Sequence, residues 1–133
     1  MKKFKNLLVF VMILFALSCQ KKDNMPVDTT AVSVLFTDLT YGQVFHKGET
    51  IPVNALVSYP GEIVGVYADI SDSASGTLFY EDNADTHTNN FDFKRSWVDT
   101  LSDATTLQVK ITVFLANNTS KPAERVIYVK SEL

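Results

Sequence analysis

Short runs in which apolar and polar residues alternate recur along this chain, and they restrict its fold more than any other feature. The clearest run covers residues 107–115, and its apolar positions are Leu107, Val109, Ile111, Val113 and Leu115. A period of two places alternate side chains on opposite faces of an extended strand. No segment after residue 18 has the 3.6-residue period of an amphipathic helix. The sequence therefore predicts an all-β fold.

Turn signals divide this pattern into about seven short strands, expected at residues 31–36, 51–59, 62–71, 77–80, 91–98, 107–115 and 125–130. Pro60-Gly61 is expected to close one strand, and residues 72–76 are expected to form a tight turn within a hairpin. Residues 81–90 are the most polar stretch, so we expect a surface loop there. Short strands separated by turns every 8 to 12 residues or so are typical of an antiparallel β-sandwich.

The first nineteen residues have the layout of an export signal. Three lysines precede an unbroken apolar run over residues 7–17, and the small residue Ser18 stands directly before Cys19. A charged region, an apolar region and a small-residue cleavage site are typical of a secretory signal. At ~1.5 Å per residue the apolar run spans only about 16 Å, which is short of the ~30 Å apolar core of a bilayer. We therefore expect residues 1–18 to be removed.

The tetrapeptide Ala16-Leu17-Ser18-Cys19 resembles the lipobox of bacterial lipoproteins. In that family the cysteine becomes the new N-terminus and carries acyl chains, so the resemblance implies lipidation of Cys19. Residues 20–24 are similar to the charged segment that follows this cysteine in many lipoproteins of Bacteroidota. The resemblance implies a lipid anchor in the outer membrane of the cell envelope, facing either the periplasm or the surface. A plain signal peptide with an incidental cysteine is the alternative.

Composition limits what the mature chain can be. Residues 19–133 suffice for one domain, which we expect over residues 31–133 after a flexible tether over residues 19–30. Beyond residue 18 lie nine Lys and Arg residues against fifteen Asp and Glu residues, a formal charge of −6. This acidic balance argues against a nucleic-acid partner. Because Cys19 is the only cysteine and is the proposed acylation site, no cysteine remains for a disulfide, a zinc-thiolate site or a nucleophile.

Catalysis has little support in the sequence. His46 and His87 are the only histidines, and no Gly-x-Ser-x-Gly motif accompanies them. His46 falls in a Gly-flanked turn, so we expect it in a solvated loop. Two carboxylate pairs have the chemistry of glycosidase acids but suit turn capping better, namely Asp69 with Asp72 and Asp99 with Asp103. We expect no enzyme, no catalytic residue and no cofactor.

Two kinds of binding site remain as alternatives. The acidic segment 81–87 offers Asp82, Asp85 and His87 as weak metal-ligand candidates, because carboxylates suit hard cations and imidazole suits softer ones. This segment lacks the residue order of a calcium loop. A sugar site would instead use exposed aromatic rings as stacking platforms. Five aromatic residues are expected at outward or loop positions: Tyr41, Tyr67, Tyr80, Phe114 and Tyr128.

Residues 42–53 and the alternating run at 107–115 look like bacterial immunoglobulin-like domains, including small Bacteroidota lipoproteins with no assigned activity. The resemblance implies an immunoglobulin-like β-sandwich. The Cys…Trp…Cys core of antibody domains is absent, so Trp97 is not expected to have that role. We therefore expect a lipid-anchored, non-catalytic binding or accessory module with an envelope protein or glycan as its partner. Metal binding through residues 81–87 and carbohydrate binding are the alternatives.

Overall fold

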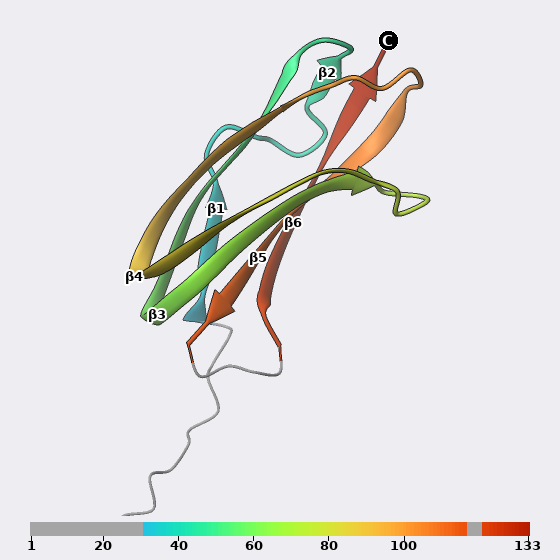
Figure 1. Ribbon diagram of the computed structural model, residues 1–133. Coiled ribbons are helices and arrows are strands. Elements are labelled where there is room, and N and C mark those ends of the chain that lie inside the picture. Colours follow the sequence, from blue (N-terminus) through green and yellow to red (C-terminus); the bar gives the residue numbers. More distant parts are fainter. Residues whose placement is uncertain (1–30, 117–120) are drawn as a thin grey trace, which may run out of the picture.

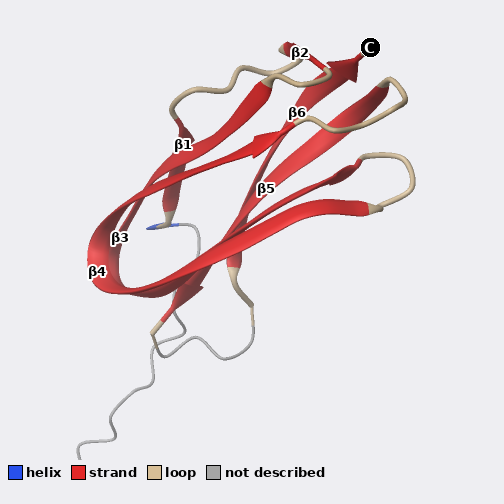
Figure 2. Ribbon diagram, turned by 45° about the horizontal axis from the view of Figure 1, so that its top comes forward, coloured by secondary structure: helices blue, strands red, loops and turns tan. Residues whose placement is uncertain are grey.

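The computed structural model describes residues 31–116 and 121–133 (Figure 1). Strands account for most of this part of the chain and no α-helix occurs in it (Figure 2), which confirms the expected all-β class. The strands are β1 (Ser33–Phe36), β2 (Val44–His46), β3 (Thr50–Asp72), β4 (Leu78–Val98), β5 (Thr105–Leu115) and β6 (Ala123–Glu132). The predicted signal, Cys19 and the tether lie outside the described residues.

Two long strands, β3 and β4, form a bent hairpin that contributes to both layers of the fold. They pair antiparallel from Thr50 with Val98 to Ser71 with Leu78. The first half of β3 also pairs with β1, and its second half pairs with β5. Figure 1 shows this hairpin as the curved green and yellow ribbons that turn from one layer into the other. The sheet therefore curls over on itself.

The resulting layers are those of an immunoglobulin-like β-sandwich, as the sequence predicts. The first layer holds β1 with residues 50–58 of β3 and 90–98 of β4. The second layer holds the other halves of β3 and β4, followed by β5, β6 and β2. All pairings are antiparallel except that of β2 with β6. The described residues form six strands rather than about seven short ones, because β3 and β4 each serve both layers.

The expected strand break at Pro60-Gly61 is wrong. β3 runs through both residues, and its register with β4 shifts between Ser58 and Ile63. A local irregularity of this kind bends a strand without ending it. Proline fits here because no ladder partner pairs with it, so its missing N–H costs no hydrogen bond. One strand therefore replaces the two expected at residues 51–59 and 62–71.

The expected surface loop at residues 81–90 is also wrong. These residues belong to β4, where Glu81 pairs with Asp69 and Asp85 pairs with Gly65. Within the described chain β4 pairs with β3 alone, so its other edge is open to solvent. Charged residues are common on such edges, where they discourage pairing with other chains. The polarity of this segment reflects an edge strand.

The core lies between the two layers and follows the predicted alternation. From the first layer Ile51, Val53 and Ala55 are completely buried, and Phe93 of β4 packs with them. The second layer contributes the five apolar residues of β5 that the alternation selects: Leu107, Val109, Ile111, Val113 and Leu115. Each such side chain contributes about 1.5–3 kcal/mol when it is buried. The sandwich therefore depends on β3 and β5 above all.

The turn expected at residues 72–76 is confirmed, and Asp72 organises it. Its Oδ1 accepts hydrogen bonds from the N–H groups of Ala74 and Ser75 at 2.8 and 2.7 Å. Its Oδ2 accepts a hydrogen bond of 2.6 Å from the Thr105 hydroxyl. The Thr105 hydrogen bond, followed by those of the turn, lowers the pKa of Asp72 to about 2. Gly76 completes the turn with a φ of 74°, which suits glycine.

Replacing Thr105 with Val is expected to raise the pKa of Asp72 toward its ordinary value of 3.8. Because folding lowers this pKa, the contribution of the carboxylate to stability is present above pH 3.8 and is lost as the pH falls through about 2. Titration of the Asp72 carboxyl carbon by NMR measures both values. Thr105→Ser keeps the hydroxyl and should keep the low pKa. An equal pKa in the Val and Ser variants would contradict the assigned cause.

Candidate functional site

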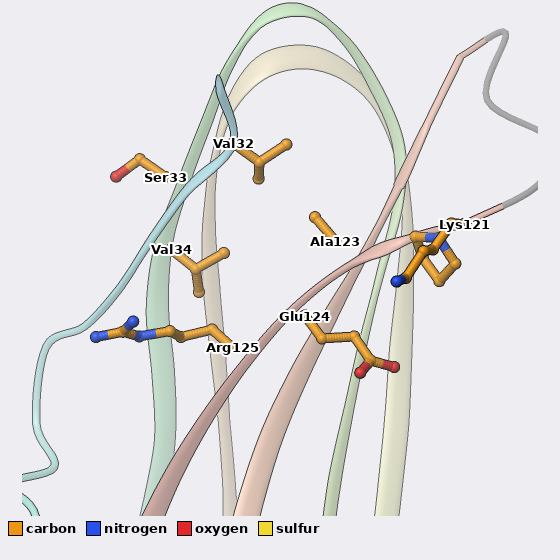
Figure 3. Close-up of a pocket in the computed structure, with 8 residues that line it drawn as sticks. Val32, Ser33, Val34, Lys121, Ala123, Glu124 and Arg125 are labelled. Carbon is orange, nitrogen blue, oxygen red and sulfur yellow. The ribbon is translucent and has the colours of Figure 1, made fainter. Parts of the chain in front are cut away.

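An open groove separates the edges of the two layers, between β1 and the first half of β6 (Figure 3). In the described residues β1 pairs only with β3, and residues 123–127 pair only with β5. The groove has a volume of about 640 Å³ and is lined by residues 32–34 and 121–125. A recess of this size between two strands has room for an extended segment of a few residues.

The edge of β1 presents main-chain groups to this groove. Along a strand, the N–H and C=O groups of successive residues point to opposite sides. Thr37 N donates to Asn54 O at 3.1 Å, so the main-chain groups of Thr37 point toward β3. Val34 and Phe36, which are in the opposite phase, therefore direct their N–H and C=O groups away from β3. Among the described strands none pairs with that side of β1.

The facing edge of β6 is likewise open over its first half. The segment that contains β2 bonds only to the second half of β6, through Tyr128 O, Lys130 N and Glu132 O. By the same alternation Glu124 and Val126 direct their main-chain groups to the same side of β6 as Tyr128 and Lys130. The β2 segment does not extend far enough to pair with them. Strand edges of this kind accept additional strands. The groove therefore lies between two edges with unused hydrogen-bonding capacity.

The side chains of the groove combine apolar surface with three charged residues, Lys121, Glu124 and Arg125. Val32, just before β1, and Val34 of β1 line it on one side, while Ala123 and Arg125 line it from β6 (Figure 3). Arg125 pairs with Ile111 in the sheet and so lies on the inner face of β6. Within residues 31–116 and 121–133, the guanidinium of Arg125 has no hydrogen bond or ion pair. An unpaired guanidinium beside apolar side chains favours a carboxylate ligand.

Sequence reasoning did not single out Arg125, although a signal was present. The phase of the last strand groups Arg125 with Ile127 and Val129, and Val129 is completely buried. A charged residue in the apolar phase of a strand marks either an edge or a site. The choice of Arg125 needs the structure, because the groove arises where β1 and β6 belong to different layers.

The three metal-ligand candidates are not brought together. Asp82 pairs with Ala68, whose side chain is completely buried, so Asp82 lies on the inner face of β4. Asp85 and His87 lie on the outer face, and His87 Nδ1 is 2.8 Å from the carboxylate of Glu62. In the described part of the chain no group of three or more His, Cys, Asp or Glu side chains could hold a metal ion. Metal binding through this segment stays a sequence-based prediction without structural support.

Asp82 instead connects the two layers of the sandwich at the β4 edge. Its Oδ2 is 2.8 Å from Nε of Arg95, which lies in the half of β4 that belongs to the other layer. The Tyr80 hydroxyl donates to the same oxygen at 3.3 Å. Hydrogen bonds from Asn83 N–H and from Arg95 lower the pKa of Asp82. This ion pair links the two layers and leaves Asp82 engaged.

The five aromatic candidates lie in different environments. Tyr41, Phe114 and Tyr128 are 81%, 45% and 38% exposed, as expected for outward positions. Tyr67 is half-buried on the same outer face as Phe114. The expectation is wrong for Tyr80, which pairs with the buried Ile70 and packs against the core. Tyr41 contacts Tyr128 edge to face, with ring centroids 6.4 Å apart.

The remaining titratable candidates have structural partners. His46 is exposed and its Nδ1 lies 3.5 Å from Glu49. Asp69 pairs with Lys110 at 3.3 Å, and Asp72 caps its turn, so this carboxylate pair is engaged at separate places. Asp99 is buried and hydrogen-bonded, while its partner in the sequence, residue 103, is exposed. These geometries do not assemble a pair of facing acids.

Comparisons with known proteins identify no family for this chain. No protein-family model matches the chain, and no curated protein matches it. Among solved structures it is similar to the ASH / PapD-like domain of human CEP192 (PapD-like domain 7). The identity is 10%, the TM-score is 0.42, and the likeness covers 81% of this chain and 89% of the other. Across the described ranges no helix is long and apolar enough to cross a membrane.

Proposed function

We propose that this protein is a lipid-anchored, non-catalytic binding module of the cell envelope that holds an extended segment of a partner protein between β1 and β6. The observation that carries the proposal is the groove with an open strand edge on each side. A peptide that lies along either edge gains main-chain hydrogen bonds whatever its sequence. Val32 and Val34 add apolar contacts at alternate positions.

Charge at the groove determines the kind of segment that fits. Arg125 has no carboxylate partner in the described chain, and its guanidinium can bind a carboxylate through two hydrogen bonds. The preferred segment therefore has alternating apolar residues and an Asp or Glu opposite Arg125. Such a segment also avoids the Pro residues that would remove main-chain donors.

The predicted lipid anchor supports a partner close to the membrane. Eleven residues, 20–30, separate Cys19 from the first described residue, and fully extended they span at most about 40 Å. Val32, at the very start of the described chain, lines the groove. A protein on the same membrane, or a segment that emerges from it, is therefore within reach of the groove.

A defined peptide tests this proposal. The probe is an eight-residue peptide of alternating valine and threonine with a central aspartate, added to the mature lipidated chain in detergent. We expect binding that shifts the amide resonances of Val34, Glu124 and Val126, and at least ten-fold weaker binding when the peptide aspartate is replaced with lysine. Methylation of the peptide main-chain nitrogens should abolish binding, because it removes the strand hydrogen bonds.

Charge reversal at Arg125 provides the decisive comparison. Arg125→Glu should invert the preference, so that the lysine peptide binds more tightly than the aspartate peptide. Lys130→Glu is the matched control, because Lys130 is an exposed residue of β6 outside the groove. It should leave the preference unchanged. Absence of binding by either peptide, or equal effects of the two substitutions, would refute a peptide-binding groove.

A further inference from the structure

A separate recess lies over Gly65 on the outer face of the layer that contains β5. The strand register places Asp85 of β4 and Phe114 of β5 on either side of Gly65. Two residues further along β3, on the same face, Tyr67 lies beside Asn83 of β4. Because Gly65 has no side chain, its larger neighbours surround a hollow of about 430 Å³. The hollow has an aromatic residue on two sides and polar residues on a third.

Phe114 forms an apolar wall of this recess. Its side chain is 45% exposed, although the other residues of β5 in the same phase are polar: Thr106, Gln108, Lys110 and Thr112. Phe114 is not part of the hydrophobic core, because its ring lies on the outer face. An aromatic ring that keeps one face in water is suited to pack against the C–H face of a ligand.

Tyr67 forms a second wall that is held in place. Its hydroxyl donates a hydrogen bond of 2.6 Å to Oε2 of Glu81. That hydrogen bond is the main cause that raises the pKa of Tyr67 to about 12, so the hydroxyl stays protonated at neutral pH. A ring that is already fixed loses little conformational entropy when a ligand binds.

Asn83 and Asp85 supply the polar side of the recess. An amide both donates and accepts hydrogen bonds, and a carboxylate accepts them. Neither side chain has a hydrogen-bond partner within the described ranges. Neighbouring strands lie about 4.8 Å apart and alternate residues about 6.8 Å apart, so these groups frame an area the size of one or two pyranose rings. Asp85 and nearby Glu81 disfavour an anionic ligand.

We propose that this recess binds a neutral sugar, with Phe114 packed on its C–H face and with Asn83 and Asp85 hydrogen-bonded to its hydroxyl groups. Sugars present this combination of an apolar face and a ring of hydroxyls that donate and accept. The site is separate from the peptide groove, since Gly65 and Arg125 line different recesses. A module with both sites could be held on a glycan while it engages a protein.

Titration with neutral oligosaccharides tests the proposal on the mature lipidated chain. The probes are dextran, mannan and N-acetylglucosamine oligomers, followed by amide NMR. We expect at least one to shift the resonances of Gly65, Tyr67 and residue 83, and Phe114→Ala to weaken its binding at least ten-fold. Tyr128→Ala is the matched control, because this exposed aromatic residue of the same layer lies outside the recess. It should leave sugar binding unchanged.

Two further variants distinguish binding in this recess from binding elsewhere on the domain. Gly65→Ala should fold normally, because the added Cβ would meet its nearest neighbour at an ordinary 3.7 Å, yet it should weaken sugar binding by filling the hollow. Arg125→Glu should leave sugar binding intact whatever its effect on peptides. Failure of all three oligosaccharides to bind, or equal losses in Phe114→Ala and Tyr128→Ala, would overturn the proposal.

Discussion

Replacement of Cys19 with Ser is expected to move this protein completely from the membrane fraction to the soluble fraction. The predicted acyl chains on Cys19 hold the mature chain, and each buried methylene contributes ~0.8 kcal/mol, so two or three chains anchor the protein stably. Serine cannot form the thioether that carries the diacylglycerol. Cell fractionation measures the change, and mass spectrometry of the N-terminal peptide reports the acyl groups directly.

Ser18→Ala is the control for the anchor. Alanine preserves a small residue before the cysteine, so processing, acylation and membrane retention should all continue. Continued membrane retention of Cys19→Ser, or an unmodified Cys19 in the mature wild-type protein, would refute the lipid anchor. The peptide and sugar experiments remain interpretable in that case, because both sites lie wholly within the described domain.

Replacement of Asp99 with Ala is expected to lower the free energy of unfolding by about 3 kcal/mol, since each hydrogen-bonding group left without its partner costs about 1–3 kcal/mol. Asp99 is completely buried where β4 leads into the connection to β5. Its Oδ2 accepts a 2.5 Å hydrogen bond from the hydroxyl of Ser131, and its Oδ1 accepts one of 3.0 Å from Leu101 N–H. Alanine would leave both donors without partners.

The main chain at Asp99 also joins the end of β4 to the turn that precedes β3. Gly48 N–H donates to Asp99 O at 2.7 Å, and Asp99 N–H donates to Glu49 O at 2.9 Å. Urea denaturation of Asp99→Ala measures the loss. Asp103→Ala is the matched control in the same connection, where an exposed acid should contribute less than about 0.5 kcal/mol. A similar stability for the two variants would contradict the role assigned to the buried carboxylate.

The strands of the core could be predicted because side-chain periodicity is a local property. The alternation at 107–115 corresponds to β5, Thr105–Leu115, and its apolar phase is buried as expected. The turn at 72–76 was equally predictable, since Asp72 caps main-chain groups only two and three residues away. In both cases the determining contacts fall within a few residues of each other.

The two wrong predictions, the loop at 81–90 and the strand break at Pro60-Gly61, rest on local patterns that each have two possible structural causes. Residues 81–90 are polar because β4 is an edge strand, but a solvated loop would have the same composition. Pro60-Gly61 usually marks a turn, yet here the irregular register between β3 and β4 absorbs it as a bend. Neither alternative can be chosen without the neighbouring strand.

For the candidate binding sites too, local sequence identifies candidate residues, but strand pairing decides which of them lie together. Asp82 and His87 were sensible metal candidates by composition, but Asp82 pairs with Arg95 and His87 with Glu62. Gly65 carried no signal by itself and became notable only between Phe114 and Asp85. The sequence marks Tyr67 and Phe114 as aromatic candidates, but only strand pairing shows that they lie on the same face.

The sequence by itself determined the all-β class, the inward phase of the core strands and the turn at Asp72, because each depends on spacing within one short segment. The predicted lipid attachment at Cys19 likewise rests on a linear motif. Only the tertiary structure decided which strand edges stay open, where Arg125 lies and what surrounds Gly65. These features depend on strand register and on the curl of β3 and β4 between layers, which join residues far apart in the chain.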